Sequence, residues 1–245
     1  AAGHRPRQAC GRPSAMKRIV PILLAATLAA CAARPPAPLA RPVGPEPFGA
    51  VLLVPGCGGA GAHTERAARE LVAAGFAVGQ IDAGVCSADA RAATPTIRRE
   101  FARLAALPGV DRARLHLVGW SEGGAGVMAA LAEIGARSAA AFYPACANVA
   151  AWRASAPFLM ILAENDTVTP PAACLDLMER TPGAENVLAV RYGGVAHGFD
   201  NSGQSGAAAA PWTFWRLTPN GGYNPAVRDA ALLDLRIFLD GSDQK

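Results

Sequence analysis

Three features that assign many chains to a broad class are missing from this sequence. The apolar run at residues 19–30 has 12 residues, well short of the roughly 20 that a membrane-spanning helix needs. No cysteines and histidines follow the spacing of a metal site. After residue 31, 18 Lys and Arg face 19 Asp and Glu, so an excess of positive charge is lacking. We therefore expect neither a metal nor a nucleic-acid partner.

The sequence also has no internal repeats, and it is too short for two large domains. The 245 residues, 51% of them hydrophobic, suffice for one large domain with a substantial core. From residue 48 onward, short apolar segments alternate with segments of helical periodicity. Strands are expected at 50–54, 76–81, 115–118, 139–143, 158–162 and 187–192, and helices at 64–74, 95–107, 123–134, 170–180 and 225–239. This alternation predicts an α/β fold with a mainly parallel, doubly wound sheet flanked by helices.

The first residues have the composition of a targeting segment. A short positive region, MKR, precedes the apolar run, which predicts a signal peptide at residues 16–30. The segment LAAC that follows resembles a bacterial lipobox. The resemblance implies that Cys31 is lipidated, that Met16 is the true start, and that residues 1–15 are upstream read-through. An ordinary signal peptide with an incidental cysteine is the alternative.

A proline-rich tether is expected between the lipidated cysteine and the folded domain. Residues 31–47 contain six prolines and no hydrophobic periodicity, so they favour an extended linker, with the domain at 48–241. Acyl chains on Cys31 would make the membrane a partner of an exported protein. Ala32 after the cysteine favours the outer membrane, with the protein facing the periplasm.

The motif around Ser121 is the strongest chemical signal in the sequence. Residues 119–123, GWSEG, match G-x-S-x-G and follow an expected strand. In a nucleophile elbow of this pattern, a sharp strand-to-helix turn exposes the serine, and the flanking glycines let neighbouring chain pass close by. A plain glycine-rich turn is the alternative. The motif favours Ser121 as a nucleophile.

A serine nucleophile needs a base, and the base needs an acceptor that fixes its tautomer. Asp166 and His197 each follow an expected strand, so both fall at the edge of the sheet where Ser121 lies. Glu164 and Asp200 compete with Asp166 as the acid, and a loop or surface carboxylate is the default interpretation of Asp200. Of the other histidines, His116 is expected in the core, and His63 as a helix cap, a rim residue or a substrate contact.

An oxyanion formed during acyl transfer needs backbone donors. The N–H of Glu122, directly after the serine, is one candidate, and the N–H of Cys57 in the loop GCGGAG is the other, with Gly58 as its alternative. The same loop lacks the G-x-G-x-x-G spacing of a dinucleotide cradle. No cofactor is therefore expected.

Four segments together resemble the dienelactone hydrolase family of the α/β-hydrolase superfamily, over about residues 48–240: VPGCGG, GWSEGG, ENDTVTPPAAC and YGGVAHGFD. The resemblance implies the α/β-hydrolase fold, with Ser121 as nucleophile, Asp166 as acid and His197 as base. Founding members use a cysteine where this chain has Ser121, and a carboxylate that accompanies it is missing from the first loop. These departures favour a carboxylesterase for small esters or lactones over activity on dienelactone itself.

Further side chains are expected to brace or line the site. In an exported protein, four cysteines in the domain suggest two disulfides, and their positions after successive strands favour Cys57–Cys86 and Cys146–Cys174. Aromatic side chains are candidates for the wall of an apolar substrate pocket: Trp120, Phe199 and Trp212.

Two other functions compete with an esterase. A serine peptidase of the prolyl-oligopeptidase type has similar motifs around its serine and acid, but such enzymes usually carry a large additional domain for which this chain has no room. A non-catalytic surface lipoprotein that uses the fold for binding is the other alternative. The presence of Ser, Asp and His in the order expected for the fold disfavours it.

Overall fold

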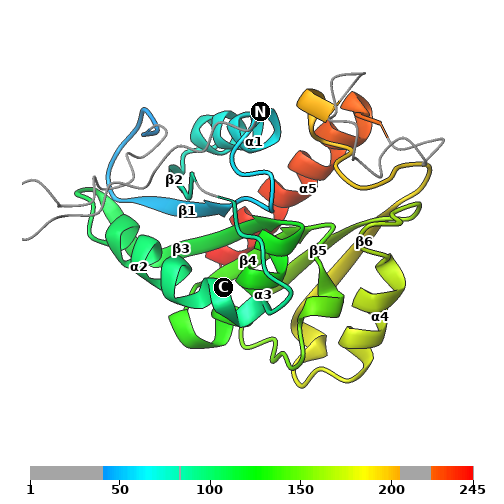
Figure 1. Cartoon of the computed structure of the whole chain (residues 1–245). Coiled ribbons are helices and arrows are strands. Elements are labelled where there is room, and N and C mark those ends of the chain that lie inside the picture. Colours follow the sequence, from blue (N-terminus) through cyan, green and yellow to red (C-terminus); the bar gives the residue numbers. More distant parts are fainter. Residues whose placement is uncertain (1–40, 83, 205–221, 245) are drawn as a thin grey trace, which may run out of the picture. The chain divides into compact units, whose positions relative to one another are not determined.

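A six-stranded sheet with all neighbouring strands parallel forms the centre of the protein (Figure 1). The computed structural model describes residues 41–82, 84–204 and 222–244, all within one compact unit. The strand order is β2-β1-β3-β4-β5-β6. The strands are β1 (Phe48–Val54), β2 (Ala77–Gln80), β3 (Val110–Trp120), β4 (Ser138–Phe142), β5 (Phe158–Ala163) and β6 (Val187–Tyr192). The predicted α/β fold with a parallel sheet is confirmed.

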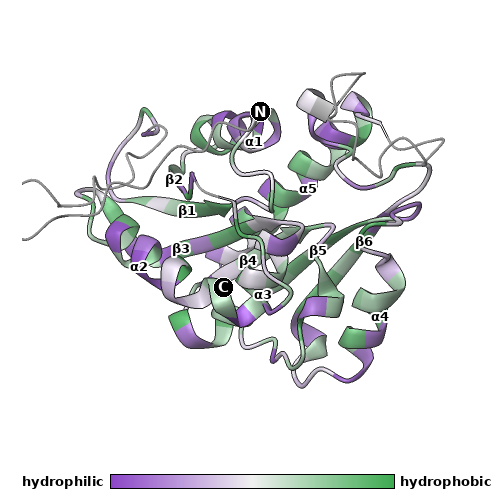
Figure 2. Cartoon of the chain, in the orientation of Figure 1, coloured by the Kyte–Doolittle hydropathy of each residue, from purple (hydrophilic) through white to green (hydrophobic). Residues whose placement is uncertain are grey.

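Helices cover both faces of this sheet. They are α1 (Ala62–Ala73), α2 (Thr94–Ala105), α3 (Glu122–Ile134), α4 (Pro171–Glu179) and α5 (Pro225–Asp243). Buried residues of α1 and α5 pack on one face, and those of α2, α3 and α4 on the other. Hydrophilic residues lie mainly on the outer sides of the helices (Figure 2). Two apolar layers therefore enclose the sheet, which explains why most strand segments are continuously hydrophobic.

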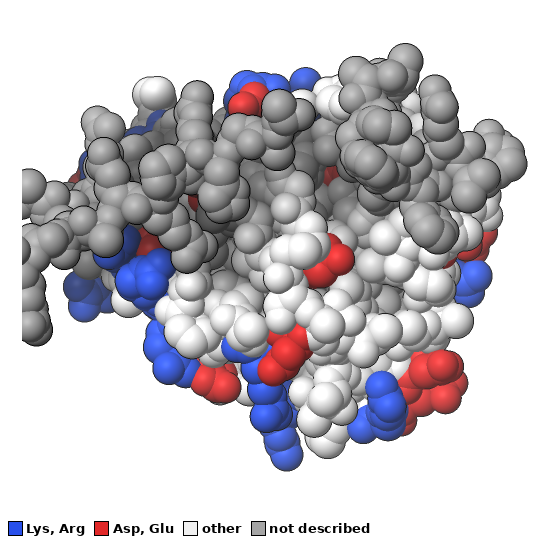
Figure 3. All heavy atoms as spheres, viewed as in Figure 1, with Lys and Arg blue, Asp and Glu red and all other residues white. Residues whose placement is uncertain are grey.

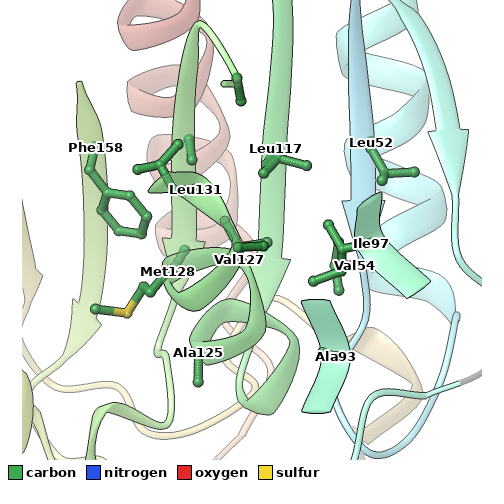
Figure 4. Packing of buried hydrophobic residues seen from close by; sticks show 14 of the residues in the cluster. Leu52, Val54, Ala93, Ile97, Leu117, Ala125, Val127, Met128, Leu131 and Phe158 are labelled. Atoms are coloured by element: carbon green, nitrogen blue, oxygen red, sulfur yellow. The ribbon is translucent and has the colours of Figure 1, made fainter. Parts of the chain in front are cut away.

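The layer around α3 holds the centre of the sheet in place (Figure 4). Val127 and Met128 of α3 are fully buried and belong to the same cluster as Leu52 of β1 and Leu117 of β3. Ile97 of α2 belongs to the same cluster and lies beside β1. The helix that follows Ser121 is thus anchored by its own packing, and the serine at its start has a rigid support.

Local signals place the helix ends. The side chain of Asn224 accepts a hydrogen bond of 3.1 Å from the N–H of Val227 and caps the start of α5. Prolines stand in the first turns of α2, α4 and α5, where a missing N–H costs nothing. Gly135 ends α3 with a φ of 71°, a conformation that glycine adopts without strain.

Strand β3 is longer than the sequence predicted. The apolar segment indicated 115–118, but the strand begins at Val110, because Phe48 of β1 pairs with this residue across a register shift. Asp111, Arg112 and Arg114 lie in this first half of β3, and their polarity hid the strand from the hydrophobic pattern.

Acidic and basic side chains are interspersed on the molecular face seen in Figure 3. In the described part of the chain, no helix is long and apolar enough to cross a membrane. Several predictions concern residues outside that part: the read-through at 1–15, the signal peptide at 16–30, Cys31, most of the tether, and Trp212.

Candidate active site

The turn between β3 and α3 holds Ser121 in an unusual backbone conformation, with φ 54° and ψ −123°. Such angles are strained for a residue with a side chain, and surrounding structure has to maintain them. A Cβ on Gly123 would lie 2.3 Å from the carbonyl oxygen of Val54, and one on Gly119 would lie 2.6 Å from the oxygen of Gly123. The two glycines therefore make the tight turn possible, and the turn sets Ser121 at the carboxyl end of the sheet.

Ser121, His197 and Asp166 form a continuous chain of side-chain contacts. The Nε2 atom of His197 lies 3.0 Å from Oγ of Ser121, and its Nδ1 atom lies 2.7 Å from Oδ2 of Asp166. The three residues come from different loops, after β3, β6 and β5, and each is less than 10% exposed. Residues that the sequence separates by up to 76 positions thus meet at one edge of the sheet.

The loop after β5 fixes the carboxylate of Asp166. Its Oδ1 atom accepts the backbone N–H groups of Val168 and Thr169, at 2.8 and 2.9 Å. The hydroxyl of Thr169 contacts Asp166 Oδ2 at 2.8 Å and His197 Nδ1 at 2.9 Å. Sequence reasoning missed Thr169; its spacing of three residues after Asp166 is the one signal for it, since side chains of Asp commonly accept such local N–H groups.

The two competing carboxylates lie elsewhere. Glu164 is exposed, and its Oε1 atom is 2.9 Å from the guanidinium of Arg191. Asp200 is 3% exposed and accepts hydrogen bonds from Trp120 Nε1 at 2.8 Å and from the hydroxyl of Tyr143 at 2.6 Å. The default interpretation was a loop or surface carboxylate: Asp200 does lie in a loop, but it is not at the surface, because two buried donors hold it inside the protein.

Tyr143 links this buried carboxylate to the histidine. Its ring centroid lies 4.5 Å from that of His197, and its backbone φ is 37°. Burial, followed by the nearby charge of Asp200, raises the pKa of the Tyr143 phenol well above its ordinary value. The phenol therefore stays protonated and donates to Asp200, and the sequence carried no signal for this contact.

A pocket of about 210 Å³ opens beside Ser121. Its lining comprises the loop 56–61 with Cys57, and His63, Trp120, Ser121, Glu122, Tyr143, Val168, His197, Gly198 and Asn201. Trp120, which the sequence suggested for the wall, lines it. Phe199 does not: its side chain is fully buried on the sheet face covered by α1 and α5, near Tyr143 and Tyr192. The expected role of Phe199 as a pocket wall is corrected to a core residue.

Glu122 contacts Ser121 through its side chain as well as following it in sequence. The hydroxyl of Ser121 donates to Oε2 of Glu122 over 2.6 Å. Sequence reasoning considered only the backbone N–H of this residue. No pattern indicated the contact, because the direction of a side chain at the first position of a helix depends on its rotamer.

The two remaining histidines occupy different environments. His63 lies in the first turn of α1, with its ring edge-on to Trp120 at 5.6 Å. Burial lowers its pKa, opposed by the charge of Asp200 and a hydrogen bond with Asn201. His116 is fully buried in β3, with Nδ1 2.8 Å from the hydroxyl of Ser138, as expected for a core histidine.

Both predicted disulfides are confirmed. Cys57–Cys86 joins the loops that follow β1 and β2, and Cys146–Cys174 joins the turn after β4 to α4. The first bridge is part of the loop that forms one wall of the pocket. Over the described ranges, no three His, Cys, Asp or Glu side chains are grouped so as to hold a metal ion.

The sequence matches a protein-family model, and the fold is similar to that of solved structures. The model of the dienelactone hydrolase family matches residues 80–220, more than half of the chain. Esterase 2 of Thermogutta terrifontis with bound butyrate is 18% identical, with a TM-score of 0.53 over 80% of this chain and 84% of that one. A dienelactone hydrolase-like promiscuous phosphotriesterase, P91, from metagenomic libraries is 19% identical, with a TM-score of 0.55 over 81% and 88%. At these identities the likeness concerns the fold. No curated protein matches the sequence.

Proposed function

The chain belongs to the dienelactone hydrolase family, and on that premise we propose that it is a carboxylic ester hydrolase with Ser121 as nucleophile. The observation that carries this proposal is the contact chain from Ser121 Oγ to His197 Nε2 (3.0 Å) and from His197 Nδ1 to Asp166 (2.7 Å). A serine hydroxyl is a weak nucleophile alone, and a histidine oriented by a carboxylate provides the base it needs.

The proposed acylation step uses these three side chains. The hydroxyl of Ser121 turns from Glu122 to His197, and Nε2 of His197 accepts its proton while Oγ attacks the carbonyl carbon of the ester. Asp166 stabilises the imidazolium that forms. When the tetrahedral intermediate collapses, the bond to the leaving oxygen breaks, and His197 returns the proton to the departing alcohol. Ser121 is left as an acyl ester, which a water molecule hydrolyses by the same steps.

The oxyanion of the intermediate is assigned to the backbone N–H groups of Cys57 and Glu122. Both residues line the pocket beside Ser121, and Glu122 is the first residue of α3, where N–H groups point out of the helix end. Removal of one such donor typically lowers the rate by about 10² to 10³. The disulfide of Cys57 supports this assignment, since it ties the loop that carries one donor to its neighbour.

Small esters or lactones fit the proposed site best. The pocket of about 210 Å³ has room for a short acyl chain, and Trp120 and Val168 supply apolar wall. The esterase from Thermogutta terrifontis was solved with butyrate, which is an acid of this size. A peptide substrate gains no support from a pocket of this volume.

An exported location is consistent with the two disulfides, which form and persist in oxidising compartments. Lipidation at Cys31 and attachment to the outer membrane stay predictions from the lipobox resemblance. Replacement of Cys31 by Ser should release the protein into the soluble fraction. Retention of this variant in the membrane fraction would contradict the anchor.

The proposed function is tested with p-nitrophenyl esters of increasing acyl length and with a fluorophosphonate probe. The wild type should hydrolyse the short esters and take up the label. The variant Ser121→Ala should take up none, and its kcat should fall by about 10⁴ or more. Ser155→Ala changes an exposed serine outside the pocket lining. It is the matched control and should behave as the wild type. A wild type that neither labels nor hydrolyses any ester would refute the proposal.

A further inference from the structure

Glu122 is the one Asp, Glu, Lys or Arg among the described residues that line the pocket. The other charged candidates near Ser121 are the two histidines. Burial lowers the pKa of His63, so its ring stays neutral at neutral pH, and His197 is the proposed base. Asp166 and Asp200 are buried in hydrogen bonds of their own, behind the lining. Among the described residues of the lining, the fixed charge that an incoming substrate meets is therefore negative.

This charge lies directly at the reacting atom. Oε2 of Glu122 is 2.6 Å from Oγ of Ser121, and a Cβ placed on Gly56 would lie 3.5 Å from the same oxygen. The carboxylate thus sits between the serine and the loop that begins at Gly56. A carbonyl group that approaches Ser121 displaces this contact, but the side chain stays on the pocket wall, since its Cα belongs to the anchored first turn of α3.

The position of Glu122 in α3 matters for the charge as well. The N-terminus of a helix carries a partial positive charge that attracts anions, including anionic substrates. A carboxylate in the first turn offsets that attraction and is itself stabilised there. The end of α3 that faces the pocket therefore presents a negative side chain beside the backbone N–H proposed to hold the oxyanion.

Resting on the proposed function, we infer that Glu122 determines substrate charge: the site selects neutral or cationic esters and rejects esters with a carboxylate close to the reacting carbonyl. Two negative charges within about 5 Å repel strongly where the surroundings are partly buried. The carboxylate of such a substrate persists through the reaction, so the repulsion lowers kcat/KM and is not confined to binding of the ground state.

A pair of substrates that differ in one charged group isolates this effect. p-Nitrophenyl butyrate and mono-p-nitrophenyl succinate share the leaving group and nearly the same acyl length, but the second ends in a carboxylate. The measured quantity is the ratio of their kcat/KM values in wild type, Glu122→Gln and Glu164→Gln. The glutamine at 122 keeps the backbone N–H and the side-chain length. Glu164 is an exposed carboxylate paired with Arg191 outside the pocket lining, and its variant is the control.

The wild type should prefer the butyrate ester by tenfold or more. Glu122→Gln should reduce this preference at least threefold, and Glu164→Gln should keep the wild-type ratio. Any change in the common rate of a variant cancels in the ratio. Equal ratios in wild type and Glu122→Gln would overturn the inference while leaving the esterase intact, and so would a wild-type ratio near one. Failure of the wild type to hydrolyse either ester would refute the proposed function itself, and the inference with it.

Discussion

The carboxylate of Asp200 accepts a hydrogen bond of 2.6 Å from the phenol of Tyr143 in the interior of the protein. Its other oxygen accepts the indole N–H of Trp120, which lines the pocket. Tyr143 in turn packs its ring beside that of His197. Asp200 therefore holds the pocket wall through Trp120, and through Tyr143 it holds the ring that packs against the proposed base.

Asp200→Asn should lower both stability and activity. An amide has one acceptor oxygen, so its NH₂ group faces one of the two donors and leaves it unsatisfied, at a cost of about 2 kcal/mol in the free energy of unfolding. A shift of Tyr143 would displace His197, and we expect kcat/KM to fall by about tenfold. Urea unfolding and ester hydrolysis measure the two effects.

A similar contact elsewhere supplies the control for this variant. Asp234 of α5 also accepts a 2.6 Å hydrogen bond from a tyrosine, Tyr192, but it is less buried and lies outside the pocket lining. Asp234→Asn should cost less than about 1 kcal/mol and leave kcat/KM at the wild-type value. Equal effects of the two variants would argue against a special role of Asp200.

Gly123→Ala should destabilise the fold at the serine turn. The added Cβ would lie 2.3 Å from the backbone oxygen of Val54 and 2.4 Å from that of Pro55, and the end of β1 cannot move without breaking its pairing with β3. We expect a loss of about 3 kcal/mol or more in the free energy of unfolding. Gly241→Ala in α5 should instead gain about 0.5–1 kcal/mol, because nothing lies within 4 Å of the new Cβ and alanine favours a helix. Opposite signs in urea unfolding would bear out this reasoning.

The two disulfides should contribute similarly to stability and differently to activity. They join cysteines 29 and 28 positions apart, so the chain-entropy model gives about 3.6 kcal/mol for each. Cys57→Ser with Cys86→Ser should also lower kcat, because the loop with Cys57 lines the pocket. Cys146→Ser with Cys174→Ser should lose stability alone. The double variant at Cys57 and Cys86 is measured below its unfolding temperature. A wild-type kcat there would contradict the proposed donor role of the Cys57 loop.

Acid should destabilise the protein through His116. Burial, assisted by Arg137 and Arg114, lowers the pKa of this histidine to about 4. Nε2 lies 3.1 Å from Asp243 Oδ1 but is not aligned as a hydrogen bond, so the contact does little to favour the charged ring. Below pH 6.5 the unfolded chain binds a proton at His116 that the folded chain does not. Stability should therefore fall by about 1.4 kcal/mol per pH unit from pH 6.5 toward pH 4.

His116→Gln separates this effect from other titrating groups. His63, whose pKa is also lowered, acts in the same direction as His116. Both His63 and Asp243 are present in the wild type and in the variant. Between pH 7 and pH 5, the wild type should lose about 2 kcal/mol more stability than the variant in urea unfolding. Parallel curves for the two proteins would show that His116 titrates normally when folded.

Much of the fold followed from local patterns in the sequence. Buried parallel strands have continuous apolar runs, and glycine or proline marks where helices end or begin, so the β/α alternation predicted the sheet. The first half of β3 was missed because its side chains are polar and its place in the sheet depends on pairing with Phe48, a partner more than 60 residues away. Phe199 was misplaced because an aromatic residue in a loop has no periodicity to show which way it points.

By itself, the sequence determined the motif at Ser121, the order of the candidate residues, and the pairing of four cysteines that follow strands at one sheet edge. These depend on chain-local spacing and on strand direction. Only the tertiary structure decided which carboxylate meets His197: Asp166 does, Asp200 holds Tyr143 and Trp120, and Glu164 faces solvent. It also decided that the side chain of Glu122 reaches Ser121. The physical reason is that strand order, loop conformation and rotamers set the distances between side chains at angstrom scale, and no spacing in the chain encodes them.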